Sequence, residues 1–263
     1  CGEVRGNVTL RRQQYRIADN TEKRIEVARN CIVGKVYNSR WILERAIRDY
    51  PLRLDVEKIK EKSSFLASRL KEIRTCESPD KLLGLEGESA SVYFSVFDEL
   101  ILQQKETFYF HGRNRRPPLD NVNAMLSFAY SLLAGICTSA LETVGLDPYV
   151  GFFHTDRPGR ASLALDIMEE LRSVMADRFV LTLINKRIVD SSGFLQKENG
   201  AVIMDDDTRK KFLAAWQDKK KEVITHPFLG EKMEWGMVPH VQAMLLARYV
   251  RGDLEEYPPF LWK

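Results

Sequence analysis

Four residues in two separate stretches of the chain have the side chains of a metal site: Glu86, His154, Asp166 and Glu169. Carboxylates with one imidazole suit a hard divalent cation such as Mg²⁺ or Mn²⁺, and zinc is chemically possible. A divalent cation there activates a bound hydroxyl and neutralises charge on a phosphodiester. We predict that Glu86, His154 and Glu169 bind the metal and that Asp166 acts beside them.

Glu86 stands out because it falls on the apolar side of its predicted helix. If residues 82–101 form one helix, its apolar face carries Leu83, Ala90, Tyr93, Phe94, Phe97 and Ile101. Glu86 falls inside that stripe, whereas Glu88, Asp98 and Glu99 fall on the other side. Burying an unpaired carboxylate costs several kcal/mol. A bound cation is one way to compensate that cost.

The second stretch combines a histidine with two acids on a predicted helix. Asp166 and Glu169 lie three residues apart and share one side of the helix that starts at Ser162. Taken alone, the two acids could be a solvated face, and His154 could be a structural hydrogen-bonding residue. The loop 155–160, with Pro158 and Gly159, could instead return the chain so that both acids face His154.

Basic residues near these stretches are candidates for phosphate contacts. The formal net charge is only +3, so no global basic field indicates nucleic acid. The loop 107–118, TFYFHGRNRRPP, places Arg113, Arg115 and Arg116 close together, with His111 beside them. Arg172 follows Glu169 by three residues. A single basic run is often only a solvated face, but we include all four arginines as DNA-binding candidates.

Composition limits the class of protein. The hydrophobic fraction of 44% and charged fraction of 29% are typical of a globular protein. The four cysteines, at positions 1, 31, 76 and 137, form no CxxC pair, which favours free thiols in a reducing cytoplasm. No Walker loop, GxGxxG, HExxH or GxSxG motif is present.

One segment is long and apolar enough to span a bilayer. Residues 121–141 carry no charge. They do contain polar side chains, and small residues recur every four positions at Ser127, Ser131, Gly135 and Ser139. Such a stripe lets another helix approach closely. We therefore interpret the segment as a central, fully surrounded helix and expect no membrane association.

The remaining patterns predict a mostly α, multi-helix globular catalytic domain with at most a small β-hairpin. Helices are expected at about 22–50, 55–75, 82–101, 119–144, 162–172, 175–186, 207–222 and 237–250. The hairpin is expected at 194–204, where Asn199-Gly200 supplies the turn. Residues 1–20 are polar and partly β-like, and we expect a connector there.

Several segments resemble one family in their order along the chain. The run Leu82-Leu-Gly-Leu-Glu-Gly resembles the Leu-x-Gly-x-Glu-Gly segment of the CRISPR spacer-acquisition integrases, the universal first Cas protein. Further similar segments are residues 112–124 (GRNRRPPLDNVNA), 126–130 (LSFAY), 145–155 (GLDPYVGFFHT) and 162–170 (SLALDIMEE). Each segment is a weak motif alone, but together they are highly specific.

The resemblance implies a metal-dependent DNA endonuclease and integrase acting in CRISPR adaptation. It implies that Glu86, His154 and Glu169 hold the catalytic metal, with Asp166 as a nearby functional carboxylate. The 3′-hydroxyl ends of double-stranded DNA would attack phosphodiesters of the CRISPR array. Family members form a homodimer and bind a second, small Cas protein.

Two departures from the family pattern stand out. The third ligand is often Asp in the family, whereas here it is Glu169. Family members also begin with a β-rich domain, while this chain starts at Cys1 without methionine. We expect residues 1–20 to connect to that domain and residues 21–263 to be the catalytic domain.

Two other functions are compatible with the same residues. A non-enzymatic DNA-binding scaffold would use the basic runs without chemistry, and chelators would not affect its binding. That alternative leaves Glu86 without a role. An unrelated metallohydrolase of small phosphoesters would turn over a small substrate and leave DNA intact.

Overall fold

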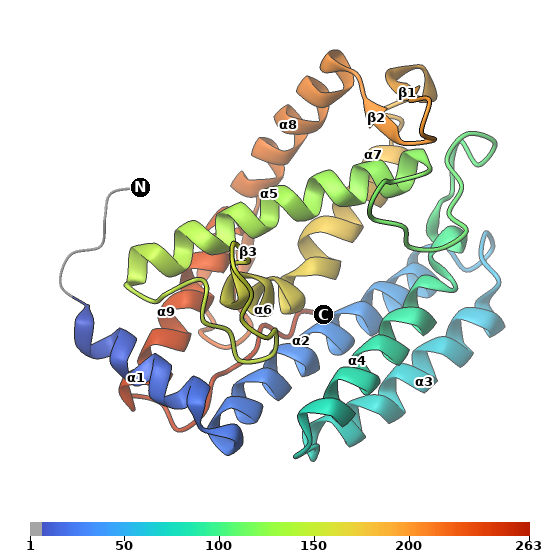
Figure 1. Cartoon of the computed structure of the whole chain (residues 1–263). Helices are drawn as coiled ribbons and strands as arrows, with labels where there is room; N and C mark the ends of the chain where they lie inside the picture. Colours follow the sequence, from blue (N-terminus) through green and yellow to red (C-terminus); the bar gives the residue numbers. More distant parts are fainter. Residues whose placement is uncertain (1–6) are drawn as a thin grey trace.

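The apolar periodicity of the chain becomes a set of packed helices in the computed structural model, which describes residues 7–263 (Figure 1). The α-helices are α1 (Val8–Asp19), α2 (Thr21–Asp49), α3 (Val56–Arg74), α4 (Pro79–Phe94), α5 (Asn121–Val144), α6 (Ser162–Leu171), α7 (Arg178–Asn185), α8 (Asp206–Lys221) and α9 (Val238–Arg251). Short helical segments are η1 (Phe97–Leu100), the π-helical η2 (Arg172–Asp177), η3 (Ser191–Gly193) and η4 (Trp235–Met237). The strands are β1 (Phe194–Gln196), β2 (Val202–Met204), β3 (Val223–Thr225) and β4 (Lys232–Glu234). The predicted fold class, mostly α, is confirmed.

Side-chain caps set where several helices begin. Asn20, Asp55, Ser78 and Asp120 precede α2, α3, α4 and α5, and each accepts a hydrogen bond from the backbone N–H three residues later. These bonds satisfy N–H groups that a helix start leaves unpaired. Gly145 ends α5 with a φ of 89°, in the left-handed region that glycine tolerates. Local signals therefore account for these boundaries.

The β-like character expected within residues 1–20 is wrong for the part that the structure describes. α1 occupies Val8–Asp19 and buries Leu10, Gln14 and Ile17, which lie on one face of the helix. The amide of Gln14 donates to the backbone oxygens of Asp147 and Val150. Only two apolar residues mark this face, so the helical period is hard to see in the sequence. The remainder of the connector, residues 1–6, including Cys1, lies outside the described residues.

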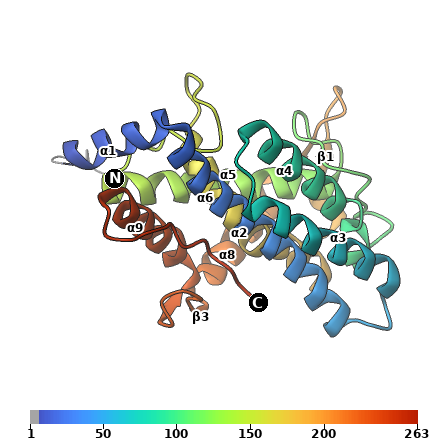
Figure 2. The ribbon, with the colours of Figure 1, turned by 90° about the horizontal axis from the view of Figure 1, so that it is seen from below.

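α2 is the central helix and determines where the site forms. It contacts α1, α3, α4, α6 and η2, and Figure 2 shows it crossing between the α1–α9 side and the α3–α4 side. Gly34 allows a close approach to α6, since a Cβ there would lie 2.6 Å from the Cβ of Glu170. The residues next to Gly34 on α2 are thereby brought against α6.

The helix that carries Glu86 is shorter than predicted and is rotated about its axis. α4 ends at Phe94, and η1 follows after a break, where the sequence predicts one helix through residue 101. Its buried residues are Leu82, Leu85, Ser89 and Tyr93, whereas Leu83 is 58% exposed. Glu86 therefore lies at the edge of the buried face and not in its middle.

Two helices predicted as separate, 162–172 and 175–186, form one continuous helical stretch. α6 passes through the π-helical segment η2 into α7. A π-helical segment inserts extra backbone into one turn and changes which side chains share a face. Every residue from 162 to 177 except Leu165 is buried, including the charged residues Asp166, Glu169, Glu170, Arg172 and Asp177.

Only one side of α5 is buried in the core. It has the length and apolar composition of a membrane span, but it packs against α6, α7, α9, η2 and β2. The expectation that it is fully surrounded is wrong for the described part of the chain. Ser131 and Gly135 of the predicted small-residue stripe are exposed, and Ser127 and Ser139 are partly exposed.

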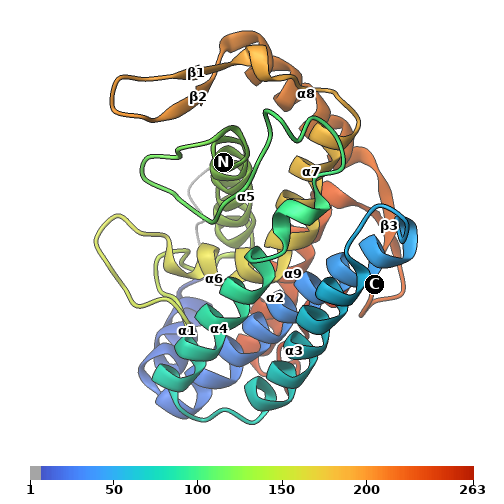
Figure 3. The same cartoon turned by 90° about the vertical axis from the view of Figure 1, so that its right-hand side faces the viewer.

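Two antiparallel hairpins complete the fold. β1 pairs with β2 as predicted, with Gly200 in the turn at a φ of 79°. Figure 3 shows this hairpin above the near end of α5, which is seen almost end-on. β3 pairs with β4 in a second hairpin that the sequence reading missed. Its three-residue strands are too short for a recognisable alternation.

The C-terminal segment packs into the core. Tyr257 and Phe260 are almost fully buried. The amide of Asn38 on α2 donates to the backbone oxygen of Phe260 at 2.7 Å, and its oxygen accepts from the N–H of Trp262 at 2.9 Å. Cys31, Cys76 and Cys137 are buried free thiols, as expected.

Candidate active site

Three charged side chains from three helices, α2, α4 and α6, meet at one position. The ammonium of Lys35 on α2 contacts Oε1 of Glu86 on α4 and lies 2.7 Å from Oε2 of Glu169 on α6. The exposed fractions of these side chains are 10%, 17% and 4% for Lys35, Glu86 and Glu169. The fold therefore brings together the two predicted carboxylates and places a cation between them.

His154 lies beside Glu169, and Asp166 lies behind His154. Nε2 of His154 is 3.9 Å from Oε1 of Glu169, and its Nδ1 is 2.7 Å from Oδ1 of Asp166. The Asp166 carboxylate also accepts hydrogen bonds from the backbone N–H groups of Phe152, Phe153 and His154, at 2.6, 3.0 and 2.9 Å. Asp166 thus faces the histidine and its backbone, not the position between the glutamates.

Two cations keep Glu169 ionised. Burial opposes its ionisation, but Arg172, with Nη2 at 2.7 Å from Oε1, and Lys35 outweigh that effect and lower the pKa of Glu169 to about 2. Glu169 therefore carries its charge at any physiological pH. Arg172 is buried against Glu169 and is not a surface contact for DNA in this arrangement.

The donor set fits a hard divalent cation. Carboxylate oxygens of Glu86 and Glu169 surround one cationic position, and an imidazole nitrogen lies beside it. Oε2 of Glu169 is buried and makes no well-directed hydrogen bond, despite its closeness to the ammonium. In the present side-chain arrangement, no three His, Cys, Asp or Glu side chains within residues 7–263 are close enough to hold a metal. In this arrangement the Lys35 ammonium lies between the Glu86 and Glu169 carboxylates.

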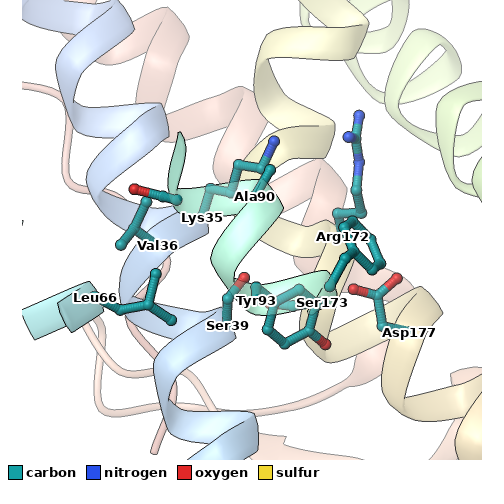
Figure 4. Close-up of a pocket in the computed structure, with 11 residues that line it drawn as sticks. Lys35, Val36, Ser39, Leu66, Ala90, Tyr93, Arg172, Ser173 and Asp177 are labelled. Carbon is teal, nitrogen blue, oxygen red and sulfur yellow. The ribbon is translucent and has the colours of Figure 1, made fainter. Parts of the chain in front are cut away.

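A small cavity extends behind Lys35. Figure 4 shows Lys35 and Arg172 extending in the same direction, with Tyr93 and Asp177 at the opposite end. The cavity has a volume of about 10 Å³, roughly the room that one water molecule needs. The lining residues are Lys35, Val36, Ser39, Leu66, Ser89, Ala90, Tyr93, Phe94, Arg172, Ser173 and Asp177.

The arginines of the 107–118 loop have different roles. The guanidinium of Arg113 donates to Oδ1 of Asn123 at 2.7 Å and to the hydroxyl of Ser127 at 3.1 Å, which fastens the loop to α5. Arg115 and Arg116 are exposed and face solvent. Of the four arginines predicted to contact DNA phosphates, these two are exposed enough to reach DNA.

Tyr130 links this loop to the glutamate site. The guanidinium carbons of Arg113 and Arg172 lie 5.1 and 4.9 Å from the centre of its ring. Its hydroxyl donates to Oδ1 of Asp177 at 2.5 Å. Burial raises the pKa of Asp177 to about 6, although Tyr130 and Arg172 act against that shift. Arg113 of the loop and Arg172, which contacts Glu169, thus both pack against the ring of Tyr130.

Sequence reasoning missed Lys35, although a signal was present. Lys35 lies three residues after Ile32 and one before Val36, both fully buried on α2. It is a charge on an apolar face, the same feature that singled out Glu86. His226 lies away from these residues, is fully buried and bonds through Nε2 to Oε1 of Gln242.

Comparisons with known proteins agree with this architecture. The family model described as CRISPR associated protein Cas1 matches residues 1–218. The CRISPR-associated endonuclease Cas1 1 of Chlorobaculum tepidum is 51% identical over 262 residues, covering 100% of this chain and 76% of that protein. The CRISPR-associated endonuclease Cas1 of Leptospira interrogans is 44% identical, covering 97% of this chain and 100% of that protein.

A solved structure shows the same fold. A casposase bound to its integration product superposes with a TM-score of 0.85 at 27% identity, covering 99% of this chain and 70% of the casposase. The family-model match and the identities to these relatives lead to one assignment. The chain belongs to the CRISPR-associated Cas1 family.

Proposed function

We propose that this protein is a metal-dependent DNA endonuclease and integrase that inserts new spacers into a CRISPR array. The observation that carries the proposal is the convergence of Glu86 and Glu169, from two helices, on one cationic position beside His154. Relatives named as endonucleases support phosphodiester cleavage. The casposase, described as bound to an integration product, supports strand transfer.

In the proposed site, Glu86, His154 and Glu169 hold one Mg²⁺ or Mn²⁺ ion. When bound, the ion would favour deprotonation of an attacking hydroxyl and neutralise charge on the phosphodiester. Asp166 holds the Nδ1–H of His154, so that the lone pair of Nε2 points toward the Glu169 side. Arg172 keeps Glu169 ionised and in place.

DNA would lie across the side of the molecule on which three loops project. Figure 3 shows the loop before α5, the loop before α6 and the β1–β2 hairpin projecting toward the same side. The first of these loops is joined to the hairpin by the N–H of Val202, which donates to the backbone oxygen of Pro118 at 2.8 Å. Arg115 and Arg116 lie on this loop and are exposed. They would contact phosphates of double-stranded DNA.

The partners follow from the same proposal. A homodimer would present two such sites to the two ends of an incoming DNA duplex, and the second, small Cas protein of the adaptation complex would join the two halves. The proposed location is the cytoplasm, without membrane association. Family membership and the free thiols support this assignment.

The test uses the full chain with DNA duplexes that carry 3′-hydroxyl ends and a plasmid that contains a leader and repeat. Glu86→Gln, His154→Asn and Glu169→Gln should each lower strand transfer and cleavage at least about 100-fold, because several kcal/mol of charge stabilisation would be lost. Glu99→Gln, at a remote surface ion pair with Lys58, is the control. Wild-type activity in all three site variants would overturn the proposal.

A chelator separates this function from a DNA-binding scaffold. With EDTA, strand transfer should stop, and added Mg²⁺ or Mn²⁺ should restore it. Salt-sensitive DNA binding that ignores EDTA, with no cleavage or strand transfer under any metal, would instead support the scaffold. Turnover of a small phosphoester without activity on DNA would support a different metallohydrolase.

A further inference from the structure

We propose that Lys35 is a built-in counter-ion that a divalent cation displaces from Glu86 and Glu169. The inference rests on the proposed metal site and adds a residue that takes part in loading it. Lys35 would stabilise the site before the metal binds and would set the concentration of metal that the site needs.

The contacts of Lys35 carry the inference. Its ammonium touches Oε1 of Glu86 and lies 2.7 Å from Oε2 of Glu169, so one cation is shared by two carboxylates from different helices. The residue is 8% exposed and therefore largely shielded from water. The backbone at this point of α2 is held against α6 by the close approach at Gly34. The ammonium is thus held in the position where the carboxylate oxygens converge.

Electrostatic repulsion would prevent the Lys35 ammonium and a divalent metal ion from occupying the same position between the carboxylates. Without a cation between them, two largely buried carboxylates would repel each other across a poorly solvated space. Lys35 removes that repulsion. A divalent ion among the same oxygens would in turn repel the ammonium, so binding one cation releases the other. Lysine suits such an exchange because its charge lies at the end of a flexible four-carbon chain.

Arg172 differs from Lys35 in this respect. It contacts Glu169 at Oε1, the other oxygen of the same carboxylate, at 2.7 Å. Its guanidinium is also stacked on Tyr130, with its central carbon 4.9 Å from the ring centre. Arg172 therefore stays in place when the metal enters, while Lys35 leaves.

The first experiment measures Mn²⁺ binding by calorimetry without DNA. Lys35→Met removes the competing cation and should tighten Mn²⁺ binding at least about tenfold, which corresponds to about 1.4 kcal/mol. The same variant should unfold at lower temperature than wild type without metal and should gain more thermal stability from Mn²⁺. Lys58→Met, which removes an exposed lysine paired with Glu99, should match wild type in Mn²⁺ affinity.

The second experiment uses the wild-type protein and does not depend on whether the variant folds. Limited acetylation with acetic anhydride, followed by peptide mass spectrometry, reports the accessibility of each lysine amine. Saturating Mn²⁺ should raise labelling of Lys35 several-fold, because its ammonium leaves the carboxylates. Labelling of Lys58 should not change.

The outcomes distinguish the inference from the proposed function. If Glu169→Gln abolishes Mn²⁺ binding but Lys35→Met leaves it unchanged or weakens it, the metal site stands and the role of Lys35 is overturned. Unchanged or reduced labelling of Lys35 with Mn²⁺ would overturn that role as well. If neither wild type nor Lys35→Met binds Mn²⁺, both the metal site and the inference fail.

Discussion

Nδ1 of His154 lies 2.7 Å from Oδ1 of Asp166, and this pairing determines which ring nitrogen of the histidine faces Glu169. Asp166 is fully buried, and its other contacts are three backbone N–H groups. A carboxylate that only accepts hydrogen bonds requires a proton on Nδ1 and leaves Nε2 as the electron-pair donor. In the proposed metal site, Asp166 would therefore be a positioning residue that acts through His154.

Asp166→Asn should weaken Mn²⁺ binding by about 10- to 100-fold, the usual effect of losing a partner behind a metal-bound histidine. The amide also places N–H groups against backbone donors, so the free energy of unfolding should fall by about 1–3 kcal/mol. Nitrogen NMR of the histidine ring gives a separate readout. It should show a proton held on Nδ1 in wild type and a changed distribution of protons between the two ring nitrogens in the variant. Asp253→Asn, in a surface pair with Arg251, is the control, and an unchanged tautomer in Asp166→Asn would contradict the assignment.

Glu170 should make the protein less stable as pH rises from 5 to 8. Burial raises the pKa of Glu170 from the ordinary 4.5 to about 7, although Tyr257, Gln242 and the N–H of Phe260 donate to it and lower the pKa. Between these values the folded protein keeps a proton that the unfolded chain releases. The contribution of Glu170 to the free energy of unfolding is therefore fully present below about pH 4.5 and is lost as pH rises through 7. The loss should be at most about 3 kcal/mol.

Denaturant unfolding of wild type and Glu170→Gln at several pH values checks this prediction. The variant cannot ionise and should lose most of the slope between pH 5 and 8. Asp177, with a pKa raised to about 6 mainly by burial, contributes in the same direction, so Asp177→Asn measures its share. A wild-type stability that rises over this interval would contradict the assignment for both residues.

The arginines of the 107–118 loop should separate into a structural and a binding class. Arg113→Ala removes the bonds to Asn123 and Ser127 and should lower the free energy of unfolding by about 1–3 kcal/mol. Arg115→Ala and Arg116→Ala should change stability by less than about 0.5 kcal/mol. Each should instead reduce the salt dependence of DNA binding by about one phosphate contact. Normal stability in Arg113→Ala would contradict its role in fastening the loop.

Gly34 and Gly135 should respond to alanine in opposite directions. A Cβ at Gly34 would meet the Cβ of Glu170 at 2.6 Å, so Gly34→Ala should destabilise the protein by about 1–3 kcal/mol. Gly135 is exposed on α5, and a Cβ there meets nothing within 4 Å. Gly135→Ala should stabilise by about 0.5–1 kcal/mol, because alanine favours the helix. Thermal unfolding of both variants measures the two changes in stability. Equal changes would show that the close contact between Gly34 and Glu170 does not exclude a Cβ.

Much of the fold could be predicted because its signals are local. Apolar periodicity and capping residues identified α2, α3, α5, α8 and α9, and Asn199-Gly200 identified the first hairpin. The prediction failed where the signal was short or weak. α1 has two buried apolar residues, and the second hairpin has three-residue strands. The break after α4 and the π-helical segment after α6 depend on packing that no local pattern reports.

The sequence by itself determined the helical class, the family and the residue types of the site, because these depend on local pattern and on motif order. Only the tertiary structure decided which of those side chains contact one another. The close approach of α2 to α6 at Gly34 brings Lys35 to Glu86 and Glu169. The hydrogen bonds of the segment before His154 draw Asp166 behind the histidine. The direction of a helical side chain depends on which face its helix buries, and that face is set by helices far away in the sequence.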